Sequence, residues 1–332
     1  MINRQIPLID LHRHLDGSIR LQTILDLAKQ HDLPLPATNL EELRPLVQIM
    51  EPQPGVMAFI AKFEWMVGVL ADYDACRRIA YENVLDAQSE GIHYIELRFS
   101  PLFMAQPHHL DTVDVVSAVL DGLEQGAEET GVKVNAIGIL SRHYGPKMAM
   151  QELNALLGHK QRIVALDLAG DEANFPGQLF VEHFKIARAE GWHITVHAGE
   201  AAGAESIWQA VEELGAQRIG HGARLMEDPL LVETVFQNKI GVETNLTSNV
   251  QTSTFASYEE HPLKAMLQAD LLATINTDDP GISAIDLPHE YEIAAPAAGL
   301  SSDQIQIAQA NALEIAFLSA EEKEALSQSI AN

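Results

Sequence analysis

LIDLHRHLDG, at residues 8–17, is a short apolar segment that ends in two histidines and a loop. Seven further β-rich segments follow it, and stretches with helical spacing separate them. The eight segments predicted as strands are 8–14, 92–100, 132–140, 162–170, 192–199, 217–222, 239–246 and 271–278.

The segments between these strands favour helices that cover a sheet. Apolar residues recur there at i, i+3, i+4 and i+7, as in Val116, Val119, Leu120 and Leu123, or Ile207, Ala210, Val211 and Leu214. Strands that alternate with helices pair in parallel, and eight such units can close on themselves. We therefore predict an α/β fold, the (β/α)8 TIM barrel. An open doubly wound sheet is the alternative, but it usually has a Gly-rich loop after its first strand, and HRHLDGSIR at 12–20 is not one.

Residues 18–90 are too many for one crossover helix. We expect a helical insertion over the barrel mouth, and further helices at the C-terminus, with all of 1–332 in a single barrel domain. Prolines are expected to break the insertion into several helices. They are Pro34, Pro36, Pro45, Pro52 and Pro54.

The composition limits the classes of partner. The chain has 47 acidic and 21 basic side chains, for a formal charge of −26. This charge disfavours nucleic acid and anionic membranes but leaves a neutral or cationic small molecule as a ligand. No apolar stretch approaches the ~18 residues of a membrane span, and MINRQIPLID at 1–10 lacks the pattern of a signal peptide. We expect a cytoplasmic protein, whose oligomeric state the sequence does not indicate.

Reactive side chains stand at the predicted strand ends, which is where barrel enzymes of this kind place their chemistry. His12 and His14 end the first strand, and their i, i+2 spacing points both rings to one side. His197 ends the fifth strand, His221 the sixth and Asp278 the eighth. An H-x-H pair alone is a weak indication, but its coincidence with the other strand ends favours a metal site.

Three imidazoles and a carboxylate suit Zn²⁺. Two-metal barrel hydrolases commonly use a carbamylated lysine after strand four, and IVALDLAGDE at 163–172 contains no lysine, so we expect one metal. His221 could then be spared to orient a water, while Asp278 could both touch the metal and accept a hydrogen bond from that water. The remaining histidines considered, expected in loops or on helix and turn surfaces, are His31, His108, His109, His159, His183 and His261.

Seven motifs occur in the order found in the adenosine deaminase family, and the chain resembles that family over nearly its whole length. They are LHRHLDG, RFSP, DLAGDE, VHAGE, GHG, TSN and NTDDP. The resemblance implies one Zn²⁺ per chain, a proton-donating Glu200 and a water-orienting His221, with Asp278 also catalytic. The implied reaction is deamination of adenosine, and of 2′-deoxyadenosine, to inosine and ammonia in purine salvage. The implied metal ligands are His12, His14, His197 and Asp278.

The resemblance also implies contacts with the nucleoside. Asp279 would bond N7 of the purine, the Gly170 N–H would meet N3, and Asp16 would hold the ribose 5′-hydroxyl. Aromatic residues of AFIAKF at 58–63 resemble an apolar lid over the purine. The implied substrate-binding residues are His14, Asp16, Gly170, Asp279, Phe59 and Phe63.

The residues themselves leave other roles open. Gly170 could serve only a turn with positive φ, Asp16 could cap a helix from Ser18 onward, and the aromatic cluster could be plain core. The chain also departs from the family at Asn245 and Leu246, where Cys and Pro usually precede TSN. That departure leaves the wall on the base side uncertain.

Three other functions compete with adenosine deamination. An adenine deaminase would share the metal site but typically has Glu in place of Asp16. An AMP deaminase would need a basic cluster for the phosphate, which the sequence lacks. A catalytically dead nucleoside-binding barrel would need neither Glu200 nor His221, so the complete set argues against it.

Overall fold

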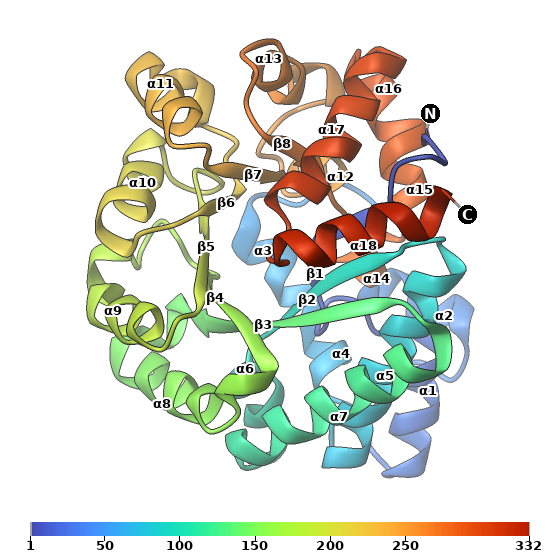
Figure 1. Cartoon of the computed structure of the whole chain (residues 1–332). Coiled ribbons are helices and arrows are strands. Elements are labelled where there is room, and N and C mark those ends of the chain that lie inside the picture. The colour runs from blue at the N-terminus through green and yellow to red at the C-terminus, as the bar shows by residue number, and fades with distance from the viewer. Residues whose placement is uncertain (1, 332) are drawn as a thin grey trace.

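The computed structural model describes residues 2–331, and these contain all eight predicted strands. The strands pair in parallel in the order β1 to β8, and helices surround them (Figure 1). The prediction of a (β/α)8 barrel is therefore confirmed. The strands are β1 Ile9–His14, β2 Tyr94–Phe99, β3 Lys133–Ser141, β4 Ile163–Ala169, β5 His193–Ala198, β6 Arg218–His221, β7 Gly241–Thr244 and β8 Ala273–Ile275.

The barrel closes where the chain just after β8 meets β1. Arg13 and Asp278 form a parallel bridge there. The Asp278 N–H donates to the His12 carbonyl at 2.8 Å, and the His14 N–H donates to the Asp278 carbonyl at 2.8 Å. The side chain of Asn276 also accepts the Leu11 N–H at 3.0 Å. The seam thus includes three of the residues that the sequence placed in the metal site, His12, His14 and Asp278.

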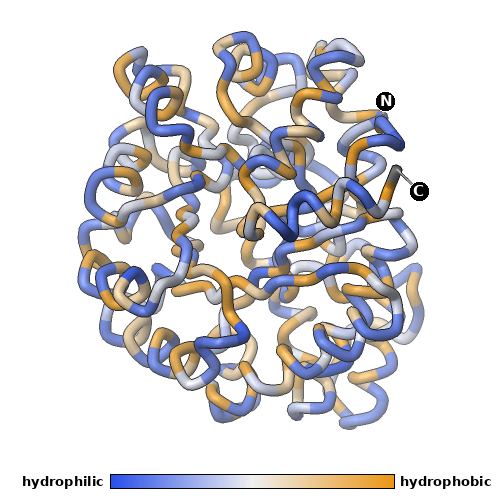
Figure 2. Tube along the Cα trace, viewed as in Figure 1, coloured by the Kyte–Doolittle hydropathy of each residue, from blue (hydrophilic) through white to orange (hydrophobic). Residues whose placement is uncertain are grey.

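Helices with one apolar face form the ring outside the sheet. In α7 the predicted apolar positions Val116, Val119, Leu120 and Leu123 are all buried. Figure 2 shows the same mixture of hydrophobic and hydrophilic residues along the other outer helices. The helices after β2 are α6 Pro101–Ala105, α7 Thr112–Thr130, α8 Gly145–Leu157, α9 Val181–Ala189, α10 Ala204–Gln209 with the π-helix Ala210–Leu214, α11 Pro229–Gln237, α12 Leu246–Gln251, α13 Leu263–Gln268, α14 Pro280–Ser283, α15 Leu287–His289, α16 Ala295–Ala297, α17 Ser302–Ile315 and α18 Ala320–Ala331.

Between β1 and β2 the chain forms several helices, as expected, but one of the predicted breaks is wrong. Pro45 lies inside α2, which Asn39 caps by accepting the Glu42 N–H at 3.0 Å. The helix tolerates the proline because it ends two residues later, at Val47. The helices here are α1 Leu21–Gln30, α2 Leu40–Val47, α3 Val56–Ile60, α4 Glu64–Val67 and α5 Tyr73–Ser89, with the 3-10 turn η1 Ala61–Phe63 before α4.

The last helix of this segment, α5, packs along α7 in the outer ring and does not cover the barrel mouth. Two glycines of α7 permit the close approach. A Cβ on Gly122 would lie 2.2 Å from the carbonyl oxygen of Arg77, and one on Gly126 would lie 2.6 Å from the Cβ of Val84. The segment 18–90 therefore divides into short helices near the mouth and an ordinary crossover helix.

The end of the barrel where the strands begin is covered by the C-terminal part of the chain. Phe317 donates its N–H to Glu96 at 2.8 Å, and the Arg218 guanidinium lies 3.5 Å from the centre of its ring. In Figure 1, α18 crosses in front of the strands. A pocket lies at the opposite end, where the strands finish. Within residues 2–331, no helix combines the length and apolarity needed to cross a bilayer.

The contact between α5 and α7 generates a stability prediction. Gly122→Ala should lower the free energy of unfolding by about 1–2 kcal/mol, because overpacking against a backbone carbonyl outweighs the helix propensity gained. Denaturant unfolding measures this. The exposed neighbour Gln125, changed to Ala, is the matched control and should have little effect. A Gly122→Ala protein as stable as wild type would contradict the close packing.

Candidate active site

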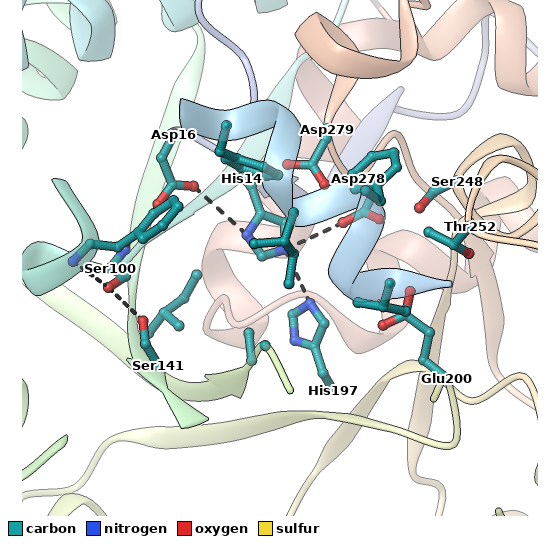
Figure 3. Close-up of a pocket in the computed structure, with 18 of the residues that line it drawn as sticks. His14, Asp16, Ser100, Ser141, His197, Glu200, Ser248, Thr252, Asp278 and Asp279 are labelled. Atoms are coloured by element: carbon teal, nitrogen blue, oxygen red, sulfur yellow. Dashed lines mark hydrogen bonds and ion pairs between the residues drawn. The ribbon is translucent and has the colours of Figure 1, made fainter. Parts of the chain in front are cut away.

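A pocket lies at the ends of the strands and encloses about 620 Å³ of empty space, its open mouth included. This size is typical of small-molecule sites. Figure 3 shows that its polar side chains come from several strand ends and face one another. The lining residues are His14, Asp16, Val56, Phe59, Ile60, Phe63, Ser100, Phe103, Ile139, Ser141, His143, Ala169, Gly170, His197, Glu200, His221, Ser248, Thr252, Asp278 and Asp279.

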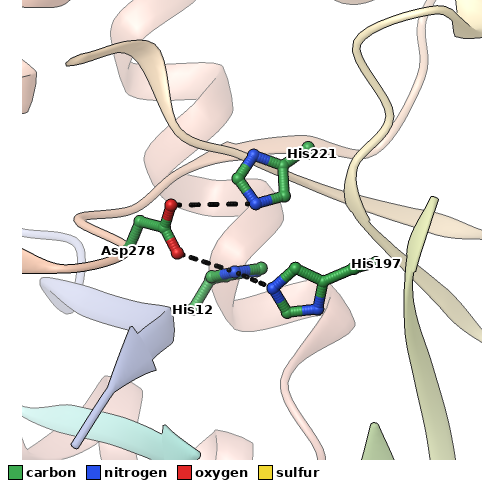
Figure 4. Close-up of side chains that lie close together, drawn as sticks. All are labelled: His12, His197, His221 and Asp278. Atoms are coloured by element: carbon green, nitrogen blue, oxygen red, sulfur yellow. Dashed lines mark hydrogen bonds and ion pairs between the residues drawn. The ribbon is translucent and has the colours of Figure 1, made fainter. Parts of the chain in front are cut away.

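Four donor atoms converge at the floor of this pocket. Nε2 of His197 lies 3.1 Å from Nε2 of both His12 and His14. Oδ1 of Asp278 lies 3.2 Å from Nε2 of His12 and 3.3 Å from Nε2 of His14. Figure 4 adds His221, whose Nε2 is 3.7 Å from the other Asp278 oxygen. Nitrogen and carboxylate donors at such spacing can hold a divalent metal ion.

Buried carboxylates set the orientation of two of these rings. His12 places Nδ1 2.7 Å from Glu243, and His197 places Nδ1 3.0 Å from Asp167. Each carboxylate accepts a hydrogen bond from Nδ1–H, so each Nε2 directs its lone pair into the cluster. Arg98 lies between the two carboxylates, 2.8 Å from Asp167 and 2.7 Å from Glu243.

The charges in this network keep both carboxylates ionised. Burial alone would raise their pKa values, but the charges of His197 and Arg98 hold the pKa of Asp167 below its usual range. Those of Arg98 and Arg218 hold the pKa of Glu243 well below its usual value. The two anions therefore remain available as hydrogen-bond acceptors for the imidazoles.

Two residues of the site have backbone conformations that side chains other than glycine rarely adopt. His221 has φ = +61° and Asp278 has φ = +63°. Such conformations persist only where the surroundings impose them, and they concentrate at functional sites. The neighbour Gly220 also permits close packing, since a Cβ there would lie 2.9 Å from the His12 ring. Glycines on both sides of His221 thus allow the chain to turn its ring into the cluster.

Glu200 follows β5 on a loop that one carboxylate holds in place. Glu172 accepts the N–H groups of Gly199 at 2.7 Å and Ala201 at 2.6 Å, and that of Glu200 itself at 3.1 Å. The Glu200 side chain is 9% exposed, with Oε1 3.6 Å from Nδ1 of His221. Burial, with the nearby charges of Asp278 and Glu172, raises its pKa well above the usual value. A protonated carboxylic acid beside the cluster can act as a proton donor.

The other acidic candidates also line the pocket. Asp279 is buried, and burial and the charge of Asp278 raise its pKa well above the usual value. Burial raises the pKa of Asp16 to about 7, and its Oδ1 lies 3.9 Å from Nδ1 of His14. The alternative role of Asp16 as a helix cap is wrong, because α1 begins only at Leu21 and no side chain caps it.

For Gly170, Phe59 and Phe63 the sequence left two roles open, one structural and one in lining the substrate pocket. The structure has features of both. Gly170 has φ = +103° and also lines the pocket. Phe59 and Phe63 are buried, yet both line the pocket from the α3 and η1 side. Phe103, which the sequence reasoning missed, stacks edge-on against Phe63 with ring centres 5.7 Å apart.

Further residues of the site were not found from the sequence. Ser100 and Ser141 line the pocket and bond each other at 2.8 Å, and both bond the buried Glu152. Arg98 and Glu243 had one available signal, since each is a charged residue inside a predicted strand. Their partners come from other strands, so the sequence did not reveal the network.

The expectation that His183 and His261 lie on the surface is wrong. Both are buried, His183 with Nε2 2.8 Å from the Pro146 carbonyl and His261 with Nε2 3.1 Å from Oδ1 of Asn249. Hydrogen bonds replace the water that they would otherwise contact. At the departure from the family motif, Asn245 is buried with its amide 3.3 Å from Nδ1 of His221.

Comparisons with known proteins identify the family of the chain. The family model for adenosine deaminase matches residues 7–332. A protein named adenosine deaminase from Photorhabdus laumondii is 58% identical over 332 residues, with 100% of both chains covered. Another of that name from Salmonella schwarzengrund is 56% identical over 331 residues, covering 100% of this chain and 99% of the relative.

Solved structures share the fold. An adenine deaminase from Arthrobacter aurescens matches with a TM-score of 0.91 at 24% identity, covering 98% of each chain. The N6-methyl-AMP deaminase of Arabidopsis thaliana matches with a TM-score of 0.82 at 26% identity, covering 99% of this chain and 97% of that one. The full-length family match and the identity to the two named relatives together show that this chain belongs to the adenosine deaminase family.

Proposed function

We propose that this chain hydrolyses adenosine and 2′-deoxyadenosine to the corresponding inosine and ammonia, with one Zn²⁺ per chain, in the salvage of purines. The observation that carries the proposal is a set of four potential metal-donor atoms, each 3.1–3.3 Å from others in the set, beside Glu200, whose pKa is raised well above its usual value. The reaction needs both a nucleophilic water at neutral pH and a proton for the purine ring.

We assign the metal to the rings of β1 and β5 and to the residue after β8. Four donors at ~2.0–2.1 Å from an ion in tetrahedral geometry lie ~3.3 Å from one another, close to the observed spacings. His14 is preferred to His221 as the third imidazole, because its Nε2 is 3.3 Å from the Asp278 oxygen that also faces His12. When bound, Zn²⁺ supplies Lewis-acid activation of water at neutral pH. The proposed ligands are His12, His14, His197 and Asp278.

Three side chains divide the proton chemistry around C6 of the purine. Burial and the nearby charges of Asp278 and Glu172 raise the pKa of Glu200 well above its usual value, which favours the protonated form that can donate to N1. His221 and the second oxygen of Asp278, 3.7 Å apart, would hold the attacking water between them. Protonation of N1 makes C6 more electrophilic, so the water oxygen forms a bond to C6. One water proton goes to the amino group, which leaves as ammonia when the C6–N bond breaks, and the other proton restores the acid form of Glu200.

Recognition of the base falls to residues around the upper part of the pocket. Burial and the charge of Asp278 raise the pKa of Asp279, which favours the protonated form, and only in that form can Asp279 donate to N7, which is an acceptor. Its Oδ1 is buried without a hydrogen-bond partner in the chain. The Gly170 N–H would meet N3, while Phe59 and Phe63 would cover the apolar face of the purine.

The charge of the pocket favours a nucleoside over a nucleotide. Its acidic lining residues are Asp16, Glu200, Asp278 and Asp279, and among the described residues that line it there is no Lys or Arg. A phosphate beside Asp16 would meet a carboxylate without a compensating cation. The Arabidopsis relative is named for a nucleotide, so adenosine against AMP is the informative comparison.

The metal assignment predicts different outcomes for a ligand and for its partner. His197→Ala should abolish both bound zinc and activity. Asp167→Asn keeps every proposed ligand but weakens the hydrogen bond to His197, so zinc affinity should fall about 10- to 100-fold. Elemental analysis and chelator competition measure these effects.

A matched control lies in the loop that follows β4. Asp171→Asn makes the same chemical change where the carboxylate bonds only Asn174, so zinc affinity should stay unchanged. Two zinc ions per wild-type chain, or full activity without metal, would contradict the assignment.

Glu200→Gln keeps the size of the side chain but removes its acidic proton. We expect the variant to retain zinc and its fold while turnover falls ~10²–10⁴-fold. Glu205→Gln, an exposed change in the next helix, should leave turnover at the wild-type value. Loss of zinc together with activity in Glu200→Gln would show that Glu200 is not primarily a proton donor.

A substrate panel tests the whole proposal and the role of Asp16. Wild-type protein should release ammonia from adenosine and 2′-deoxyadenosine, and its rate with adenine or AMP should be far lower. A charge-assisted hydrogen bond to the ribose contributes ~1.5–3 kcal/mol, so Asp16→Ala should lower kcat/KM for adenosine roughly ten- to hundredfold and leave that for adenine nearly unchanged.

Lengthening the same side chain provides the complementary test. Asp16→Glu should push the carboxylate into the ribose space and narrow the preference for adenosine over adenine. Equal losses on both substrates would mean that Asp16 supports the end of β1 and does not read the ribose. A wild-type protein that releases no ammonia from adenosine would overturn the proposed function.

A further inference from the structure

The ring of His221 is held from the side that faces away from Asp278. Nδ1 of His221 lies 3.0 Å from the side-chain amide nitrogen of Asn249, in α12. The amide of Asn245 is almost equally distant from the two ring nitrogens, at 3.3 and 3.4 Å, so it lies over the ring rather than in line with either lone pair. Glu200 is too far from Nδ1, at 3.6 Å, for a hydrogen bond. Asn249 is therefore the in-line partner of Nδ1.

His261, on the side of Asn249 away from His221, determines which way the side-chain amide of Asn249 points. The backbone N–H of Leu263 donates to Nδ1 of His261 at 3.1 Å, so Nδ1 carries the lone pair and the proton of this ring is on Nε2. Nε2 then donates to Oδ1 of Asn249 at 3.1 Å. Burial lowers the pKa of His261 to about 3, which keeps the ring neutral.

The donor and acceptor roles of His261 and Asn249 determine which nitrogen of His221 carries the proton. Oδ1 of Asn249 accepts from His261, so the amide nitrogen of Asn249 must be the group that faces His221. An amide nitrogen only donates, and Nδ1 of His221 must therefore be an acceptor. The proton of His221 is then on Nε2, on the side of Asp278. The opposite tautomer would set two N–H groups against each other in a buried place and would be disfavoured about tenfold or more.

We propose that a series of hydrogen bonds positions His221 as a hydrogen-bond donor towards the attacking water. The series runs from Leu263 through His261 and Asn249 to His221, and we name it the tautomer relay. Asn249 and His261 are positioning residues that act through His221. This inference rests on the proposed function and deepens it. Because Nε2 already carries a proton, His221 orients the water without removing its proton, and the carboxylate of Asp278 is the neighbouring acceptor.

The test compares variants that keep or reverse the donor and acceptor roles in one hydrogen bond of the relay. Asn249→Asp has the same size but offers His221 an acceptor, so kcat for adenosine should fall at least tenfold while KM changes less than about twofold and zinc is retained. His261→Gln keeps a donor near the position of Nε2 and should retain most of kcat. His261→Asn keeps only the acceptor near Nδ1 and should lose kcat about as far as Asn249→Asp.

A matched control removes general destabilisation as an explanation. Asn311→Asp makes the same amide-to-acid change where the amide bonds two backbone carbonyls near the start of β8, and kcat should not change. A direct readout is ¹⁵N NMR of the histidine rings in the zinc-loaded protein, with His221 assigned by its substitution. Wild-type His221 should be protonated on Nε2, and Asn249→Asp should move protonation to Nδ1.

The outcomes separate the relay from the proposed function. Protonation of Nδ1 in the wild-type ring, equal kcat for His261→Gln and His261→Asn, or unchanged kcat in Asn249→Asp would each overturn the relay. If Asn249→Asp does not fold, the His261 pair and the wild-type spectrum still decide the matter. Wild-type protein without adenosine turnover would refute the proposed function, while the spectrum would still test the relay.

Discussion

The arrangement of the site depends on one buried guanidinium. Arg98 in β2 lies between Asp167 of β4 and Glu243 of β7, and none of the three side chains is exposed to solvent. Removing one member of such a buried group leaves an uncompensated charge, which costs about 3–5 kcal/mol. Each carboxylate also accepts a hydrogen bond from an imidazole N–H, so the position of Arg98 determines the direction of the rings of His12 and His197. The geometry proposed for the metal thus originates one layer deeper in the barrel than the ligands themselves.

His221 is held by a different kind of partner, and the difference has a chemical reason. Carboxylates stand behind His12 and His197, where they favour a proton on Nδ1 and leave Nε2 free as a lone pair. Behind His221 stands the neutral amide of Asn249, which favours the opposite tautomer. One barrel therefore presents two kinds of imidazole to the same small volume. The carboxylate-backed rings suit ligation of a cation, and the amide-backed ring suits donation to an oxygen.

The strands and the candidate ligands could be predicted from the sequence because both depend on local pattern. Segments of six to nine residues rich in β-formers mark the strands, and the polar residues at their ends must meet where parallel strands end. The relay could not be predicted, because Asn249 and His261 gain their roles only through contacts that folding creates. Likewise, Arg98 is visible as a charged residue in a predicted strand, but its two partners lie in other strands. The helices between β1 and β2 were less predictable for a further reason. A proline normally indicates a break in a helix, whereas Pro45 lies inside α2.

The seam between β8 and β1 links the proposed metal site to the folding of the chain. The backbone of Asp278 closes the barrel against His12 and His14, and the same three residues supply proposed ligands. A chain still lacking its eighth strand would lack the fourth donor as well as the closing hydrogen bonds, so uptake of the ion would mark the completion of folding. A bound ion would also join the first and last strands as a cross-link does, and so slow the opening of the barrel at the place where neighbouring strands share the fewest backbone pairings.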